Sequence, residues 1–361
     1  MIKLLNGWFN RNFSDPQVVI LAFLLFVGIA IVYFIGDILT PLFAALIIAY
    51  ILDGSVAALI KFKIPRLIGS GLVFSLFILL LTGAIFWLAP LMIRQATQLV
   101  VLIPKMMAQG QTLLMQLPSK YPHIISQEQI LDLIRNIQAQ TAIFSQHVVS
   151  FSLSSVADLL SFMVYLIMVP LLVFFFLMDK NKMLTWAKRF LPYDSGLVTI
   201  VWTEVNQKIA GYMRGKLVEI LIIWAISLAT FLWLGLDYAM LLSFMVGISV
   251  LIPYVGAAVV TLPILVVGYF QWGYGSELIY VLSAYAVIQF LDGNLLVPLL
   301  FSEMVNLHPA AIIAAVLIFG GLWGLWGVFF AIPLATLVNA VINAWPETSH
   351  PDLQHLNNGE Q

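Results

Sequence analysis

Cysteine is absent from the 361-residue sequence, which excludes disulfide bonds, thiolate catalysis and metal sites built on cysteine. Charge is scarce too, because Asp, Glu, Lys and Arg make up 9% of the residues, against about 25% in ordinary soluble proteins. With a net charge of −1 there is no basic patch for a phosphate backbone, so we expect no nucleic-acid partner. The H-E-x-x-H, G-x-S-x-G and P-loop motifs are also missing. We therefore predict that the protein is not an enzyme and carries neither a metal nor another cofactor.

Apolar residues are what the chain has in abundance, at 62% against roughly 45–50% in soluble domains. A transmembrane helix needs about 20 mostly apolar residues, and the sequence offers eight runs of that kind. They cover 17–36, 38–60, 67–93, 155–178, 217–235, 239–271, 276–300 and 309–344. The first run is not followed by a small-residue cleavage site, so we expect a retained span and not a signal peptide. We predict an all-α polytopic membrane protein with about eight transmembrane helices, embedded in the lipid bilayer.

Two polar intervals interrupt the apolar runs. The first, 94–154, carries charged residues and many glutamines, with apolar residues at helical spacing near its middle, and predicts a small extramembrane helical module. The second, 179–216, is rich in lysine and arginine and is expected to lie along the membrane surface. These intervals divide the chain into a three-span segment, the module, a fourth span with a surface helix, a transport bundle and a polar tail. The five parts are 1–93, 94–154, 155–216, 217–345 and 346–361.

Positive charge in the short loops predicts an orientation, because cytoplasmic loops are enriched in lysine and arginine. Basic residues precede the first run at Lys3 and Arg11, lie between the second and third runs at 61–66, and follow the fourth run in 179–216. All three groups lie on one side of the membrane if the N-terminus is cytoplasmic and the 94–154 module is exported. With eight crossings, the C-terminus is then cytoplasmic as well.

The last third of the chain has no such signal, since no lysine or arginine occurs from Leu217 to Gln361. In the same region, polar side chains lie within apolar runs that proline and glycine interrupt, most densely from Gln289 to Pro298. Charged groups at membrane depth cost about 2.5–3.5 kcal/mol each on insertion scales, and they mark paths for solutes or ions. Acidic and amide groups without positive charge nearby in sequence favour a cation or a neutral polar solute over an anion.

Gln289, Asp292 and Asn294 are the main site candidates. Gln289 and Asp292 are three residues apart and share a face on a continuous helix, whereas Gly293 permits unwinding and Pro298 removes a backbone donor. Broken helices expose carbonyl groups and helix ends, from which many secondary transporters build their binding sites. We predict that Asp292 binds a cation or exchanges a proton, with Gln289 and Asn294 as polar ligands. The alternative is a solvated span end that continues into a turn.

The run 239–271 is too long for one simple helix, and Pro253, Gly256 and Pro263 interrupt it. We interpret it as a hinge or a re-entrant loop that faces the site, with a plain kink as the alternative. Histidine side chains are the common proton carriers near physiological pH, so His308 is a further candidate, as a proton relay. Alternatively, it caps the last helix, because the proline that follows it suits a first helical turn.

Other residues have structural explanations at hand. Small residues recur at three- and four-residue spacing in the last run, which predicts close helix packing. They are Gly320, Gly321, Gly324 and Gly327. Glu219 begins the fifth run and needs a partner, for which Arg214 or Lys216 is nearest in sequence. Asp53 ends the second run and is expected to be solvated.

The region 251–333 resembles the signature of the autoinducer-2 exporter (AI-2E) family of PerM-like permeases. The matching elements are Gly211–Gly215, Leu251–Ala257 with Pro263, Gln289–Pro298, Val305–Pro309, Phe319–Gly327 and Ala331–Pro333. The layout of three spans, a polar module and a longer C-terminal bundle also fits, so the resemblance extends over nearly the whole chain. It implies a multi-span transporter of the bacterial inner membrane that forms homo-oligomers. Named members are linked to export of autoinducer-2, and others to sodium–proton exchange.

We hypothesise that the protein exports a small polar solute, similar to autoinducer-2, by gradient-driven or passive alternating access around 251–263 and 289–309. Sodium–proton exchange, with a monovalent cation as the bound species, is the alternative within transport. A membrane scaffold that binds an envelope partner through 94–154 is the alternative of another class. The structural facts on which the hypothesis depends are the burial of Asp292 and the meeting of the two broken segments.

Overall fold

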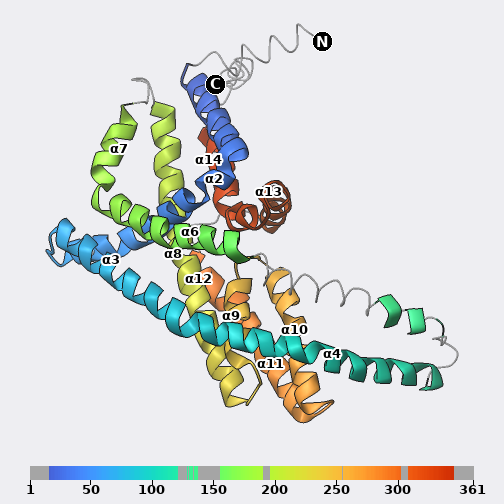
Figure 1. Cartoon of the computed structure of the whole chain (residues 1–361). Coiled ribbons are helices and arrows are strands. Elements are labelled where there is room, and N and C mark those ends of the chain that lie inside the picture. The colour runs from blue at the N-terminus through green and yellow to red at the C-terminus, as the bar shows by residue number, and fades with distance from the viewer. Residues whose placement is uncertain are drawn as a thin grey trace, which may run out of the picture.

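The computed structural model describes residues 16–120, 128, 130–132, 134–136, 155–189, 196–253, 255–301 and 308–344 (Figure 1). This part of the chain is almost entirely helical and contains no strand. Five of its helices are long and apolar enough to span a membrane, a sixth span results if two segments bent by 80° count as one, and four further apolar helices are shorter. The predicted class, an all-α polytopic membrane protein, is confirmed. The predicted tail, 346–361, and most of 121–154 lie outside the described residues.

The first two predicted runs, 17–36 and 38–60, belong to one continuous helix. Helix α2 (Pro16–Lys61) has 46 residues, which corresponds to a length of about 69 Å. No reversing turn separates the runs, so the expectation of two separate crossings is wrong for this segment. The sequence interrupts them only with Gly36 and Asp37, and an interior glycine costs a helix only about 1 kcal/mol.

The third run is likewise part of a longer helical segment. Helix α3 (Arg66–Gly83) passes through a π-helical segment, η1 (Ala84–Leu88), into α4 (Ala89–Lys120) without a turn. The predicted border at 93/94 therefore lies inside α4. Figure 1 shows α4 running across the other helices and projecting beyond them.

Helix α6 (Ser155–Met178) has the bounds predicted for the fourth run. It packs with α2 and α3 around an apolar cluster whose buried members are Ala45, Ala49, Val56, Val73, Val173 and Leu177. At Asp179 the chain bends by 80° into a short helix, α7 (Lys180–Lys188). The bend carries the basic segment away from the direction of the preceding apolar span.

Helix α8 (Gly196–Trp233) lies at the centre of the molecule and contacts α2, α9, α11, α12 and α14. The part of the basic interval 179–216 that begins at Gly196 belongs to α8. This segment contains no proline, and a salt bridge between Lys208 and Glu204, with an N–O distance of 2.6 Å, supports its helical turns. The helix therefore continues without interruption from the basic interval through position 216 into the fifth apolar run.

The sixth run is a helical hairpin. Helices α9 (Ala239–Ser249) and α10 (Val255–Trp272) are joined by a tight turn, so the predicted discontinuity in 239–271 is present. A Cβ atom at Gly256 would lie 1.8 Å from the Ser249 carbonyl oxygen. Only glycine allows the two backbones to approach this closely.

The seventh run contains a second π-helical segment. It consists of α11 (Ser276–Leu291), η2 (Asp292–Leu296) and α12 (Val297–Phe301). Within the described chain, η1 and η2 both end two residues before a proline, Pro90 and Pro298. A proline has no N–H, and its ring presses on the carbonyl four residues earlier, so a wider turn relieves the strain.

The last run forms a second hairpin. Helix α13 (Pro309–Phe329) contains a kink at Gly324, where φ is +58°, and α14 (Ala331–Ala344) follows. Beyond the kink the chain turns back on itself. The backbone at Gly327 then comes so close to Phe319 that a Cβ atom at Gly327 would lie 1.8 Å from the Phe319 carbonyl oxygen. The single span expected here is therefore two short helices packed side by side.

The four glycines of this hairpin differ in their surroundings. A Cβ atom at Gly320 would lie 2.8 Å from a methyl group of Val328, so Gly320 and Gly327 both permit close packing. Gly324 supplies the left-handed backbone conformation of the kink. A Cβ atom at Gly321 would meet nothing within 4 Å, which leaves this glycine without a packing role among the described residues.

Candidate functional site

A buried ion pair lies in the middle of α8. Lys216 Nζ is 2.8 Å from Glu219 Oε2 and 3.0 Å from Oε1, and the two side chains are only 7% and 2% exposed. Of the two cations that the sequence offered to Glu219, Arg214 instead packs its side chain against Gly54 of α2. Taking two charges out of water is costly, and polar pairs are kept inside membrane proteins mainly where they serve transport.

Asp292 joins this pair from a different helix. It begins η2, is 8% exposed, and its Oδ1 atom has no hydrogen-bond partner among the described residues. The carboxylate interacts electrostatically with both Lys216 and Glu219. We call these three residues the charged cluster. It combines two carboxylates with one ammonium group, and it gives Asp292 a positive neighbour that is distant in sequence.

Aromatic side chains close the cluster on the side of α12. Lys216 Nζ lies 5.7 Å from the centroid of the Phe301 ring, within cation–π range. The Phe301 ring is 5.5 Å from the Tyr212 ring, and both side chains are buried. A Cβ atom at Gly215 would lie 2.7 Å from the Phe301 ring, so the small residue on α8 makes room for it. These contacts keep water away from the ammonium group of Lys216.

The other two predicted ligands of Asp292 lie in different surroundings. Gln289, one turn earlier on the helix, has its Nε2 atom buried and without a partner in the described chain. Asn294 is exposed, and its Nδ2 atom donates to the Phe290 carbonyl at 2.9 Å. The structure therefore leaves an unpaired donor on Gln289 and an unpaired acceptor on Asp292. The amide of Asn294 is turned outward.

The tip of the α9–α10 hairpin reaches the same stretch of α8. A Cβ atom at Gly247 would lie 2.8 Å from the Trp224 Cβ, so α9 packs tightly on α8 little more than one turn beyond Glu219. On the other side, the Tyr285 hydroxyl of α11 donates to the Ala257 carbonyl at the start of α10, at 2.8 Å. Ala257 of the 251–263 segment thus contacts α11, the helix that leads into 289–309. Leu296 of the second segment packs against an apolar cluster that includes Val260 of the first.

The predicted backbone breaks are of three kinds. Pro253 lies in the turn between α9 and α10, and Gly293 lies within the π-turn η2, with nothing near its Cα that a Cβ would meet. Pro298 occupies the second position of α12 and explains the wide turn before it. Pro263 lies inside α10, which continues through it, so the expectation of a break there is wrong. Neighbouring groups in a helical bundle can satisfy the carbonyl that such a proline frees.

His308 acts as the N-cap of α13. Its Nδ1 atom accepts a hydrogen bond from the Ala310 N–H at 3.2 Å, and its side chain is exposed. The capping alternative is therefore the arrangement found. This nitrogen serves the end of the helix and not the charged cluster.

Sequence reasoning considered Lys216 only as a possible partner of Glu219 and missed it as a residue of the site around Asp292. A lysine and a glutamate three residues apart at the start of an apolar run is the signal that could have found it, because such residues face the same side of a helix. Tyr212 and Phe301 carried no signal, since buried aromatic residues are common in any apolar core.

A cleft of about 180 Å³ lies at another end of the bundle and does not include the charged cluster. Its lining residues are Leu102, Lys105, Met106, Gln109, Asp237, Tyr238, Val267, Phe270 and Gln271. Gln271 holds the adjoining turn, because its Oε1 accepts from the Asp237 N–H and its Nε2 donates to the Gly235 carbonyl, both at 2.8 Å. The amide of Gln271 on this side therefore serves the turn between α8 and α9.

Comparison with known proteins points to transport. Residues 20–347 match the model of the family described as AI-2E family transporter. The chain is 43% identical over 347 residues to "Putative permease PerM" of Escherichia coli (strain K12), which covers 96% of this chain and 98% of that protein. It is 28% identical over 344 residues to "Putative transport protein YueF" of Bacillus subtilis (strain 168), which covers 91% and 92% of the two chains. The range matched by the family model covers the positions of the charged cluster. The chain belongs to the AI-2E transporter family of multi-pass membrane proteins.

Proposed function

We propose that this protein exports a small polar solute across the bacterial inner membrane by alternating access around the charged cluster. The observation that carries the proposal is the buried carboxylate of Asp292, with one oxygen unpartnered in the described chain, beside the Lys216–Glu219 pair. A buried polar group without a partner is costly, and it is kept where a ligand or water completes it. Membership of a transporter family supports the same conclusion.

The charges of the cluster favour a neutral or cationic solute. Two carboxylates and one ammonium group leave an excess of negative charge, which repels an anion in a medium of low dielectric constant. The unpaired Nε2 of Gln289 donates, and the unpaired Oδ1 of Asp292 accepts. A hydroxyl group both donates and accepts, so a hydroxylated solute satisfies both atoms.

The backbone around the cluster offers places for movement. Asp292 lies in a π-turn, and the nearby hairpin turns at Pro253, so neither segment is a regular helix at this level. Transporters place irregular backbone where it lines a cavity, and such segments absorb the changes of alternating access. Opening to either side is expected to occur by movement of the α9–α10 hairpin relative to α8.

Sodium–proton exchange is the second candidate, and the ionisable groups of the cluster favour it. A sodium ion at Asp292 and a proton at the same carboxylate compete for one negative charge, which is the basic requirement of an exchanger. In this case the cluster would carry the ion itself and no organic solute.

Flux through reconstituted full-length protein tests the proposal. Proteoliposomes are loaded with autoinducer-2 or with radioactive sodium, and efflux is followed with and without an imposed proton or sodium gradient. We expect solute efflux that Asp292→Asn abolishes. Asn294→Ala is the matched control, because this side chain of the same π-turn is exposed, and its flux should remain near that of the wild type.

Each result has a definite meaning. Unchanged flux in Asp292→Asn would show that the cluster is not the site. Sodium flux with no solute flux would favour the exchanger. If neither autoinducer-2 nor sodium is transported, and cells carrying the protein without 94–154 behave like cells that lack the protein, the scaffold alternative holds and the transport proposal is wrong.

A further inference from the structure

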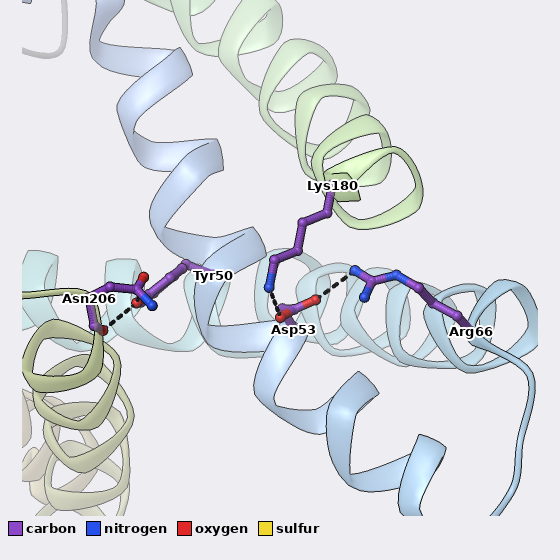
Figure 2. A network of polar contacts seen from close by, with 5 residues as sticks. All are labelled: Tyr50, Asp53, Arg66, Lys180 and Asn206. Atoms are coloured by element: carbon purple, nitrogen blue, oxygen red, sulfur yellow. Dashed lines mark hydrogen bonds and ion pairs between the residues drawn. The ribbon is translucent and has the colours of Figure 1, made fainter. Parts of the chain in front are cut away.

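A network of ion pairs joins a residue inside α2 to the first residues of α3 and α7. Asp53 of α2 accepts from Arg66 at the start of α3, with Oδ1 2.9 Å from Nη2. Its other oxygen, Oδ2, lies 2.6 Å from Nζ of Lys180 at the start of α7. Figure 2 shows Asp53 between the two cations, with Tyr50 nearby on α2 donating to Asn206 of α8. A single carboxylate thus brings together two basic segments that are far apart in sequence.

The two segments together form a basic surface. Residues 61–66 include Lys61, Lys63 and Arg66 with no acidic residue, and 179–189 includes four cations and one carboxylate. In the described chain, Asp53 pairs with Arg66 and Lys180, and Asp179 pairs with Lys182. Two carboxylates therefore face the cations of both segments, and positive charge remains in excess. Lys182 keeps 85% of its side chain exposed although it pairs with Asp179.

The turn that presents Lys61 and Lys63 is well defined. Lys63 adopts φ of +64°, and the Ile64 N–H donates to the Leu59 carbonyl, which is the arrangement of a helix C-terminal cap. This geometry leaves Phe62 79% exposed between the two lysines. On the other segment, Trp186 is 61% exposed. Exposed aromatic and basic residues at the ends of apolar helices are typical of a membrane interface.

The apolar spans end at this surface. Helix α2 ends at Lys61, α3 begins at Arg66, and α6 ends just before the bend at Asp179. Exposed apolar side chains continue along α3 from Leu67, at 68%, to Leu79, also at 68%. The basic residues therefore lie where the apolar surface of the spans stops.

We propose that this surface, formed by Lys61, Phe62, Lys63, Lys180, Lys182 and Trp186, binds the anionic headgroups of phospholipids in the adjacent leaflet. The excess of cations matches phosphate-bearing headgroups, and the apolar surface beside them is continuous with the acyl region. Asp53 is a positioning residue in this arrangement, because it holds the two segments next to each other without itself contacting the lipid. By the excess of positive charge, this is the cytoplasmic leaflet.

Lipid binding by the purified full-length protein tests the proposal. The protein in uncharged detergent is mixed with dioleoylphosphatidylglycerol or dioleoylphosphatidylcholine, and bound lipids are counted by native mass spectrometry. We expect the wild type to retain phosphatidylglycerol in preference to phosphatidylcholine. Each lysine near an anionic surface strengthens binding about five-fold. The triple variant Lys61→Gln, Lys63→Gln, Lys182→Gln should therefore bind phosphatidylglycerol about 100-fold more weakly.

Three controls make the result decisive. The matching triple arginine variant keeps the charge and should keep the preference, which also shows that substitution at these positions permits folding. Lys105→Gln removes an exposed lysine of α4 away from this surface and should leave binding unchanged. The proposal is overturned if the glutamine variant keeps the preference, if Lys105→Gln loses it equally, or if inorganic phosphate displaces the lipid at matched ionic strength.

Discussion

Removal of Lys216 separates the structural role of the charged cluster from its functional role. In the wild type, one ammonium group faces two carboxylates, Glu219 and Asp292. Lys216→Met leaves two negative charges with no cation, whereas Glu219→Gln leaves one positive and one negative charge. The charge left in the cluster therefore predicts that Lys216→Met is the more destabilising of the two changes.

The expected loss of stability in Lys216→Met follows from the geometry of the Lys216–Glu219 pair. At an N–O distance of 2.8 Å and an effective dielectric constant of about 20, the attraction between Lys216 and Glu219 is roughly 6 kcal/mol before desolvation. Removing one partner of a buried pair costs about 3–5 kcal/mol, because the remaining carboxylate either stays charged in apolar surroundings or takes up a proton. We expect about this loss for Lys216→Met and a smaller one for Glu219→Gln, since Asp292 remains beside Lys216.

Thermal unfolding in detergent and solute flux in proteoliposomes are the two measurements. The double variant Lys216→Met, Glu219→Leu replaces the pair by apolar residues of similar size, which is often neutral or stabilising. We expect its Tm to return close to the wild-type value while transport remains abolished. Recovery of stability without recovery of flux would show that the pair is kept for transport and not for folding.

Two outcomes would refute this reasoning. A wild-type Tm in Lys216→Met would mean that Glu219 finds another partner or solvent. A larger loss of stability in Glu219→Gln than in Lys216→Met would mean that Asp292 does not share the cation of Lys216.

Three further predictions rest on local geometry. Gly256→Ala should lower stability by about 1–3 kcal/mol or more through overpacking at the hairpin turn, measured by thermal unfolding, whereas Gly293→Ala should be tolerated because its Cβ meets no atom within 4 Å. Asp53→Asn should cost about 1–2 kcal/mol and loosen α7, measured by hydrogen exchange, because it removes two partly buried ion pairs, whereas Asp179→Asn, which removes only an exposed pair, should cost less than about 1 kcal/mol. His308→Ala should cost about 0.5–2 kcal/mol through loss of the N-cap and should leave the pH dependence of flux unchanged.

Each of these predictions can fail in a definite way. Equal stability of the two alanine variants would mean that the α9–α10 turn relaxes freely around a new methyl group. Unchanged exchange in α7 of the Asp53 variant would mean that the 80° bend does not depend on the ion pairs. A shifted pH profile in His308→Ala would restore this residue as a proton relay.

The sequence alone was sufficient for features that depend on neighbouring residues. The bounds of α6, the break in 239–271 and the membrane class all follow from runs of apolar residues, or from glycine and proline within a few positions. Continuity was harder to predict. The residues between the first two runs weaken a helix without stopping it, so α2 continues through them. Pro263 illustrates the same difficulty, because its effect on α10 depends on groups in neighbouring helices.

The candidate site was predicted in part. Asp292 and Gln289 were identified from polarity within an apolar run, and the structure buries Asp292 and the Nε2 atom of Gln289. The outward direction of Asn294 depends on a π-turn, which the periodicity of a regular helix cannot anticipate.

By itself the sequence determined that this is a helical membrane protein, that its polar residues lie in broken apolar segments of the last third, and that it resembles a transporter family. Hydrophobic runs and helix-breaking residues act locally, so a single chain read in order contains that information. Only the tertiary structure decided that Lys216 faces Asp292 and that Asp53 joins α3 to α7. Such pairings depend on how distant helices pack, because a charge inside a membrane protein takes its partner from whatever the fold brings within a few ångströms.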